Sequence, residues 1–203
     1  MINFTIDGKP IQLEEPESIL NAAKRLGIEI PTLCYHEKLS PYGGCRICLV
    51  EAAPGSAPER SKLVPACASR VEEGLIIKTS TQRVREARKF NIELLLSRSP
   101  DSEEIRQTAR EIGVDPDNRS ALDSVGEYLL YRAPRIRHTK CILCGLCVRV
   151  CAEITERDAL CFENRGMKRR VVPPFDKVAD TCIGCGSCAY VCTTNTITIE
   201  EVT

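Results

Sequence analysis

Thirteen cysteines are the residues most able to do chemistry in this chain of 203 residues. Two stretches, CILCGLCVRVC at residues 141–151 and CIGCGSCAYVC at residues 182–192, have the same spacing, C-x2-C-x2-C-x3-C. An internal repeat of this kind indicates that the cysteines act in sets. Thiolates are soft ligands and suit either zinc or an iron-sulfur cluster.

Another four cysteines, earlier in the chain, have a more open spacing, C-x10-C-x2-C-x18-C. They are Cys34, Cys45, Cys48 and Cys67. A zinc knuckle usually brings two CxxC pairs, whereas this set has only one. The glycines of PYGGCRIC allow backbone N–H groups to turn toward sulfur atoms. The spacing therefore favours a 2Fe-2S cluster in a loop, with zinc as the alternative.

Composition narrows the class of protein. The chain is 43% hydrophobic and 28% charged with a formal net charge of zero, which favours neither nucleic acid nor a membrane surface as the partner. The start, MINFTIDGKP, is unlike a signal peptide, and no apolar run of about 18 residues occurs. We expect a cytoplasmic protein, in whose reducing environment the cysteines bind metal in preference to forming disulfides.

The elements around the first cysteines predict a small mixed domain over residues 1–78. INFTID and KPIQLE read as strands joined by a hairpin turn at Asp7-Gly8. A helix should follow, capped by Ser18 and ended by Gly27.

Helices are predicted in a linker region over residues 79–133. The first should start near Ser80, with an apolar stripe of Val84, Ala87, Phe90 and Leu94. Ser99-Pro100 should begin a second, which Gly113 ends. We interpret the charges of these helices as a solvated face. A third domain, over residues 134–203, contains both cysteine runs and a predicted hairpin around Asn164 to Gly166.

The stretch ESILNAAKRLGIEIPTLCYHEKLSPYGGCRICLVE resembles a domain shared by several redox proteins. They are the large iron-sulfur subunit of respiratory complex I, the diaphorase subunit of NAD-linked hydrogenases, and the iron-only hydrogenases. The resemblance implies an N-terminal β-grasp ferredoxin domain, in which Cys34, Cys45, Cys48 and Cys67 bind one 2Fe-2S cluster.

The repeated C-x2-C-x2-C-x3-C spacing resembles that of bacterial two-cluster ferredoxins, in which the fourth cysteine of each run binds the other cluster. This resemblance implies one 4Fe-4S cluster on Cys141, Cys144, Cys147 and Cys192. It implies a second on Cys182, Cys185, Cys188 and Cys151. The usual proline after the fourth cysteine is replaced by Ala152 and Thr193. The expected fold class is α+β, with the two ferredoxin domains on either side of the helical linker.

One departure from the resembling families concerns an extra 4Fe-4S site. In those families the segment after ELLL usually has one histidine and three cysteines, but here SRSPDSEEIRQTAREIG has neither residue type. We expect this cluster to be absent. We also expect this chain to correspond to the electron-relay portion of such a protein, without the large catalytic domain.

For the remaining candidate residues we favour a structural role over a chemical one. Cys161 lies outside both repeats and is expected to be a buried, unreactive thiol. His138 is expected to be a surface or packing residue, although it could approach a cluster, and His36 receives no role. The basic run YRAPRIRHTK and the later KRR could bind an acidic partner, but a solvated face explains them equally well.

These observations favour an electron-transfer subunit with one 2Fe-2S and two 4Fe-4S clusters, since no GxGxxG, flavin motif or nucleophile with a base is visible. By resemblance its partners are a flavin-containing NAD(P)H-oxidising subunit and a hydrogenase or formate dehydrogenase catalytic subunit, with ferredoxin as a further candidate. A shortened relay of this kind suits an electron-bifurcating hydrogenase. The alternatives are an iron-sulfur redox sensor and, with a less fitting spacing, the iron-sulfur subunit of succinate dehydrogenase.

Overall fold

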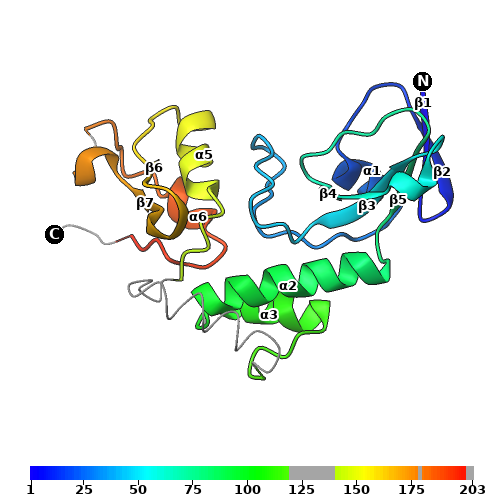
Figure 1. Cartoon of the computed structure of the whole chain (residues 1–203). Helices are drawn as coiled ribbons and strands as arrows, with labels where there is room; N and C mark the ends of the chain where they lie inside the picture. Colours follow the sequence, from blue (N-terminus) through cyan, green and yellow to red (C-terminus); the bar gives the residue numbers. More distant parts are fainter. Residues whose placement is uncertain (119–139, 178–179, 200–203) are drawn as a thin grey trace. The chain divides into compact units, whose positions relative to one another are not determined.

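The computed structural model describes residues 1–118, 140–177 and 180–199 (Figure 1). The chain divides into two compact units. Met1–Leu33 and Pro41–Asn91 form the first, and Cys34–Ser40 and Ile92–Thr203 form the second. Within the described ranges, none of the helices has the length and apolar character that a bilayer-spanning segment needs.

The first unit begins with the predicted hairpin. β1 (Ile2–Ile6) pairs antiparallel with β2 (Lys9–Leu13), and Ile6 lies opposite Lys9 across a two-residue turn. Both turn residues, Asp7 and Gly8, have positive φ values of 49° and 78°. Asp and Gly tolerate this conformation, which is the one that two-residue hairpins favour. The prediction from Asp7-Gly8 is confirmed.

The hairpin belongs to a five-stranded mixed sheet with the order β2-β1-β5-β3-β4. Its other strands are β3 (Leu49–Pro54), β4 (Lys62–Pro65) and β5 (Leu75–Lys78). β5 runs parallel to β1 and antiparallel to β3, so the two halves of the sheet join at β5. Ile6 and Ile77, paired across β1 and β5, are fully buried in the core.

Helix α1 (Ile19–Arg25) lies between β2 and β3 in the chain and supplies much of this core. The Ser18 side chain accepts a hydrogen bond from the Asn21 N–H at 3.2 Å, and Gly27, with φ 69°, follows the end of the helix. Both predicted helix limits are confirmed. A mixed sheet with one helix is the arrangement expected of the β-grasp ferredoxin fold.

Helix α2 (Gln82–Arg98) confirms the first predicted linker helix but not its apolar stripe. Val84 is buried, as expected, whereas Phe90 is 51% exposed and Ile92 is buried instead. Arg88 and Asn91 lie about one and two turns after Val84, on the same face, and both bond to backbone carbonyls of the first unit. Hydrogen bonds therefore fix the rotation of α2 as much as apolar contacts do.

Helix α3 (Glu103–Ile112) begins later than predicted. Its N-cap residue is Ser102, and the Ser99 hydroxyl instead donates to the Lys140 carbonyl at 2.6 Å. The predicted cap at Ser99 was therefore wrong, because this side chain has a more distant partner. Gly113 ends the helix with φ 82°, as predicted.

The rest of the second unit contains the cysteine runs. Its regular elements are α5 (Leu146–Glu153), β6 (Cys161–Glu163), β7 (Arg170–Val172) and α6 (Ser187–Tyr190). Short 3-10 turns occur at Pro58–Arg60, Gly166–Lys168 and Pro174–Asp176. β6 and β7 form the antiparallel hairpin predicted around Asn164 to Gly166. Leu146 and Val150 of α5 form a buried cluster with Leu39, against which Cys188 and Val191 pack.

We predict that the Asp7 carboxylate is important for the stability of the sheet. It accepts hydrogen bonds from the backbone N–H and the hydroxyl of Thr79, which is buried. Asp7→Gly keeps the positive φ but leaves both donors without this acceptor, which costs about 1–3 kcal/mol.

Hydrogen exchange of the β1 and β5 amides should therefore accelerate by roughly 5- to 150-fold. Gln12→Ala, at an exposed position of β2, is the matched control and should leave these rates within about threefold of the original. Unchanged exchange in Asp7→Gly would contradict this account.

Candidate iron-sulfur sites

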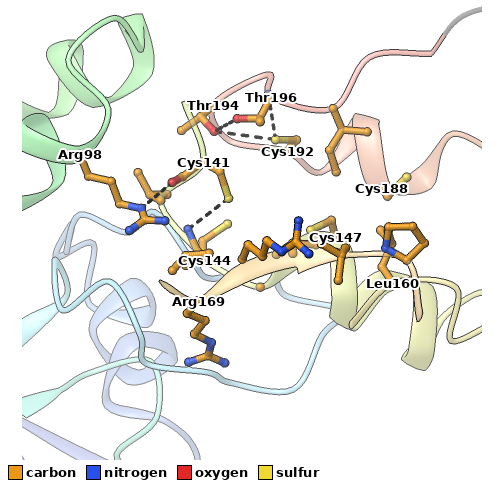
Figure 2. A pocket seen from close by; sticks show the side chains of 18 of the residues that line it. Arg98, Cys141, Cys144, Cys147, Leu160, Arg169, Cys188, Cys192, Thr194 and Thr196 are labelled. Atoms are coloured by element: carbon orange, nitrogen blue, oxygen red, sulfur yellow. Dashed lines mark hydrogen bonds between the residues drawn. The ribbon is translucent and has the colours of Figure 1, made fainter. Parts of the chain in front are cut away.

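Five cysteines from the two repeats line one cavity of about 570 Å³ in the second unit (Figure 2). Cys141, Cys144 and Cys147 come from the first repeat, and Cys192 is the last cysteine of the second. Cys188 also reaches this cavity. The structure thus places the fourth cysteine of one run beside the first three of the other.

The reciprocal arrangement occurs in a neighbouring cavity of about 450 Å³. Its lining includes Cys182, Cys185 and Cys188 of the second repeat together with Cys151, the last cysteine of the first. Cys188, Leu160, Pro173 and Ile197 line both cavities. The two cavities are therefore direct neighbours.

The two cysteine runs have a similar local backbone conformation as well as the same cysteine spacing. Gly145 and Gly186 are the residues before α5 and α6, and both adopt the left-handed conformation with φ values of 72° and 75°. A Cβ on Gly186 would lie 2.9 Å from the Ile199 side chain. Glycine at these positions lets each loop turn directly into a short helix. Helix α5 contains the third and fourth cysteines of its run, whereas α6 contains Cys188 and ends two residues before Cys192.

Backbone N–H groups point at several of the sulfur atoms. Leu143 N–H donates to the Cys141 sulfur at 3.4 Å, Ala159 N–H to the Cys151 sulfur at 3.3 Å, and Thr196 N–H to the Cys192 sulfur at 3.3 Å. Such hydrogen bonds stabilise the thiolate form that a cluster requires, and they tune its potential.

Burial has the opposite effect on the thiols at the centre of the first cavity. Burial, together with the neighbouring sulfur atoms, including that of Cys192, raises the pKa of Cys147 to about 12. Burial also raises the pKa of Cys144. These thiols are protonated at neutral pH unless a metal replaces the proton, and this donor set suits a bound iron-sulfur cluster.

Cationic side chains lie around the first cavity. Arg98 donates from Nε to the Cys141 carbonyl at 2.9 Å and so holds the start of this loop. Of the KRR stretch, Arg169 lies 3.8 Å above the Phe162 ring and Arg170 pairs with Glu163. These residues have partners within the unit, and no pattern in the sequence indicated that Arg98 contacts a cysteine loop.

Three cysteines of the predicted 2Fe-2S set belong to the first unit. Cys45, Cys48 and Cys67 are all buried, and the sulfur atoms of Cys48 and Cys67 lie 3.4 Å apart. This distance is too long for a disulfide and close to the roughly 3.8 Å between two thiolates on one tetrahedral metal with 2.3 Å bonds. The pair therefore fits two ligands of a single iron atom.

The fourth member, Cys34, is buried and belongs to the second unit through the segment Cys34–Ser40. Arg149 of α5 donates to the Cys34 carbonyl at 2.8 Å and also to the Ser40 carbonyl. The Glu153 carboxylate accepts from the Ser40 N–H at 2.7 Å. Helix α5, which presents Cys147 and Cys151, thus also holds the backbone of Cys34.

The other sequence candidates lie apart from these cavities or outside the described residues. Cys161, expected to be a buried and unreactive thiol, is half-buried on β6, opposite Val172. The His36 ring accepts from the Lys38 N–H at 3.3 Å. His138 and most of YRAPRIRHTK lie outside the described residues. All thirteen cysteines lie within the described ranges, and none of them forms a disulfide there.

Comparisons with protein families assign chemistry to both units. Residues 1–82 match a family described as a 2Fe-2S iron-sulfur cluster binding domain, and residues 176–198 match a 4Fe-4S binding domain. The chain is an iron-sulfur protein. It combines the N-terminal 2Fe-2S domain with a C-terminal 4Fe-4S domain, as the cysteine spacing and the resemblance predicted.

Three relatives are similar to this iron-sulfur protein over almost its whole length. The NADP-reducing hydrogenase subunit HndD of Solidesulfovibrio fructosivorans is 37% identical over 99% of the chain. A subunit of the NADH-quinone oxidoreductase of Rhizobium meliloti (strain 1021) is 32% identical over 95%. The NADPH-Fe(3+) oxidoreductase subunit alpha of Geobacter sulfurreducens is 33% identical over 97%. The chain spans only 36%, 23% and 24% of these relatives, respectively.

A solved structure shares the fold. A chain in the crystal structure of an NAD+-reducing [NiFe]-hydrogenase in the H2-reduced state matches with a TM-score of 0.65 and 24% sequence identity. The match covers 85% of this protein and 75% of that chain. The two chains therefore share a fold.

We predict that the last cysteine of each run serves the cavity of the other run. Cys151→Ser should disturb the site of Cys182, Cys185 and Cys188, because Cys151 lines that cavity. Cys147→Ser should disturb the site completed by Cys192. Each variant should perturb one of the two 4Fe-4S signals in electron paramagnetic resonance, with a loss of up to about four irons.

Cys161→Ser is the matched control, since Cys161 lies outside both repeats, and it should retain all of the iron. The assignment is wrong if Cys151→Ser disturbs the cluster of Cys141, Cys144 and Cys147 instead.

Proposed function

We propose that this protein relays single electrons through one 2Fe-2S and two 4Fe-4S clusters in a multi-subunit NAD(P)-linked oxidoreductase. The 2Fe-2S cluster binds to Cys34, Cys45, Cys48 and Cys67. One 4Fe-4S cluster binds to Cys141, Cys144, Cys147 and Cys192, and the other to Cys182, Cys185, Cys188 and Cys151.

The observation that carries this proposal is the crossed lining of two adjacent cavities. Each contains four cysteines in the pattern of a two-cluster ferredoxin, and Cys188 reaches both. Clusters bound in two cavities that share lining residues would be direct neighbours, which an electron relay requires. A sensor needs only one labile cluster, so the paired sites favour a relay.

The ends of the relay differ in exposure. Cys182 and Cys185 are exposed, whereas Cys45, Cys48 and Cys67 are buried. A redox partner can therefore approach the second 4Fe-4S site closely, and we assign it as a point where electrons enter or leave the chain.

The relatives, which include an NADP-reducing hydrogenase subunit and an NADPH-Fe(3+) oxidoreductase subunit, support the choice of partners. We propose a flavin-containing NAD(P)H-oxidising subunit on one side and a hydrogenase catalytic subunit on the other. A formate dehydrogenase subunit is the alternative catalytic partner, and ferredoxin is a further candidate. The proposed location is the cytoplasm, where free thiols persist.

The test is a reconstitution of NAD(P)-linked turnover from purified flavin and catalytic subunits, with and without this chain. Turnover should require the chain, because neither partner alone bridges the two half-reactions. Cys48→Ser should reduce coupled turnover at least about tenfold by disrupting the 2Fe-2S site, and leave the isolated half-reactions of the partners unchanged.

Cys161→Ser serves as the control and should support full turnover. Equal turnover in the absence of the chain would overturn the relay and favour a redox sensor.

A further inference from the structure

One face of α2 contacts the loop that contains Cys45 and Cys48, and all of these residues belong to the first unit. Arg88 donates to the Leu49 carbonyl from Nε at 3.0 Å and from Nη2 at 2.7 Å. Leu49 follows Cys48 directly. One turn further along α2, the Asn91 amide donates to the Arg46 carbonyl at 3.4 Å.

These contacts hold a loop with a strained backbone. Arg46, between Cys45 and Cys48, has φ 60°, a conformation that costs free energy in a residue other than glycine. Such a conformation persists only where its surroundings enforce it. The hydrogen bonds from α2 are placed on both sides of Cys48 and provide part of that constraint.

Arg88 also brings a positive charge into a poorly solvated region. Cys48 is 1% exposed, and Leu49 is buried beside it. Burial lowers the pKa of Arg88, and the negative charges of Cys48 and Asp7 oppose this effect. The guanidinium remains charged at all ordinary pH values. The charge of Arg88 and that of the Cys48 sulfur therefore interact across a region that water screens little.

The other arginines in the first half of α2 do not share this environment. Arg83 pairs with Glu51 at 3.4 Å, which offsets its charge. Arg85 is exposed, and its guanidinium donates to the Ser80 carbonyl at the start of the helix. Of these three side chains, only Arg88 bonds to the residue that follows Cys48.

We propose that Arg88 is a positioning residue of the 2Fe-2S site that also raises the reduction potential of the cluster. Reduction adds one electron and therefore one negative charge to the cluster, and no bond or proton at Arg88 changes. A nearby fixed positive charge stabilises the reduced form over the oxidised form. This inference rests on the proposed binding of a 2Fe-2S cluster by Cys48.

Three variants of the full chain separate the charge of Arg88 from its hydrogen bonds. Arg88→Gln removes the charge but keeps a donor near the Leu49 carbonyl. Arg88→Lys keeps the charge but loses the two-pronged hydrogen bond. Arg85→Gln removes a charge from the exposed face of the same helix and is the matched control.

The measurement is a redox titration of the reconstituted chain, monitored by the electron paramagnetic resonance signal of the reduced 2Fe-2S cluster. The midpoint potential should shift to a lower value in Arg88→Gln and stay near the original in Arg88→Lys and Arg85→Gln. The shift should persist at high salt, because a poorly solvated charge is weakly screened. The 4Fe-4S potentials should not move.

An unchanged 2Fe-2S potential in Arg88→Gln, or an equal shift in Arg85→Gln, would overturn the inference. If Arg88→Gln fails to assemble the cluster, Arg88→Lys becomes the deciding variant. An assembled cluster with the original potential in Arg88→Lys supports the effect of the charge on the potential. Loss of the cluster in Arg88→Lys would show that the role of Arg88 is structural and would overturn the proposal. An original chain without any 2Fe-2S signal contradicts the proposed function instead.

Discussion

The convergence of cysteines from both repeats is the constraint on which the second unit depends. Cys192 lies with the first run and Cys151 with the second, so neither repeat lines its cavity alone. The short helices α5 and α6 start from left-handed glycines, which let these loops turn tightly into helices. Among the described residues of this unit, the strands are two segments of only three residues each.

In the first unit, by contrast, the cysteine loop is attached to an ordinary β-sheet. β3 starts directly after Cys48, and Cys67 lies two residues after β4 ends, so the sheet places two cysteines at neighbouring positions. Helix α2 then holds the loop from outside through Arg88 and Asn91. A rigid scaffold with a constrained loop suits electron transfer, because a cluster that changes little in geometry on reduction exchanges electrons rapidly.

Local signals in the sequence predicted local structure well. Asp7-Gly8, Ser18, Gly27 and Gly113 each marked the turn or helix end that the structure contains, because each acts through its own backbone or its nearest neighbours. The predictions were wrong where hydrogen-bond partners distant in the sequence determine the local structure. Phe90 was placed in the core and Ser99 at a helix start, but hydrogen bonds from Arg88, Asn91 and Ser99 to remote carbonyls set the orientation of α2 and the start of α3.

The same distinction applies to the candidate sites. The resemblance to two-cluster ferredoxins led to the prediction that the last cysteine of each run serves the other cluster, and the cavity linings are consistent with this prediction. Cysteine spacing could not predict Arg149 on the Cys34 carbonyl or Arg88 beside Cys48, because an arginine in a charged helix looks like any solvated residue. The one usable signal for Arg88 was its position one turn after the buried Val84, on the inward face of α2.

The central claim is that one chain holds a 2Fe-2S cluster and two 4Fe-4S clusters. Mössbauer spectroscopy of the full chain, reconstituted anaerobically with 57Fe, tests this most directly because it counts the iron in each cluster type. The account predicts about one fifth of the iron in 2Fe-2S and about four fifths in 4Fe-4S clusters, at about ten irons per chain. Iron in a single cluster type, or zinc retained at the sites in competition with iron, would contradict it.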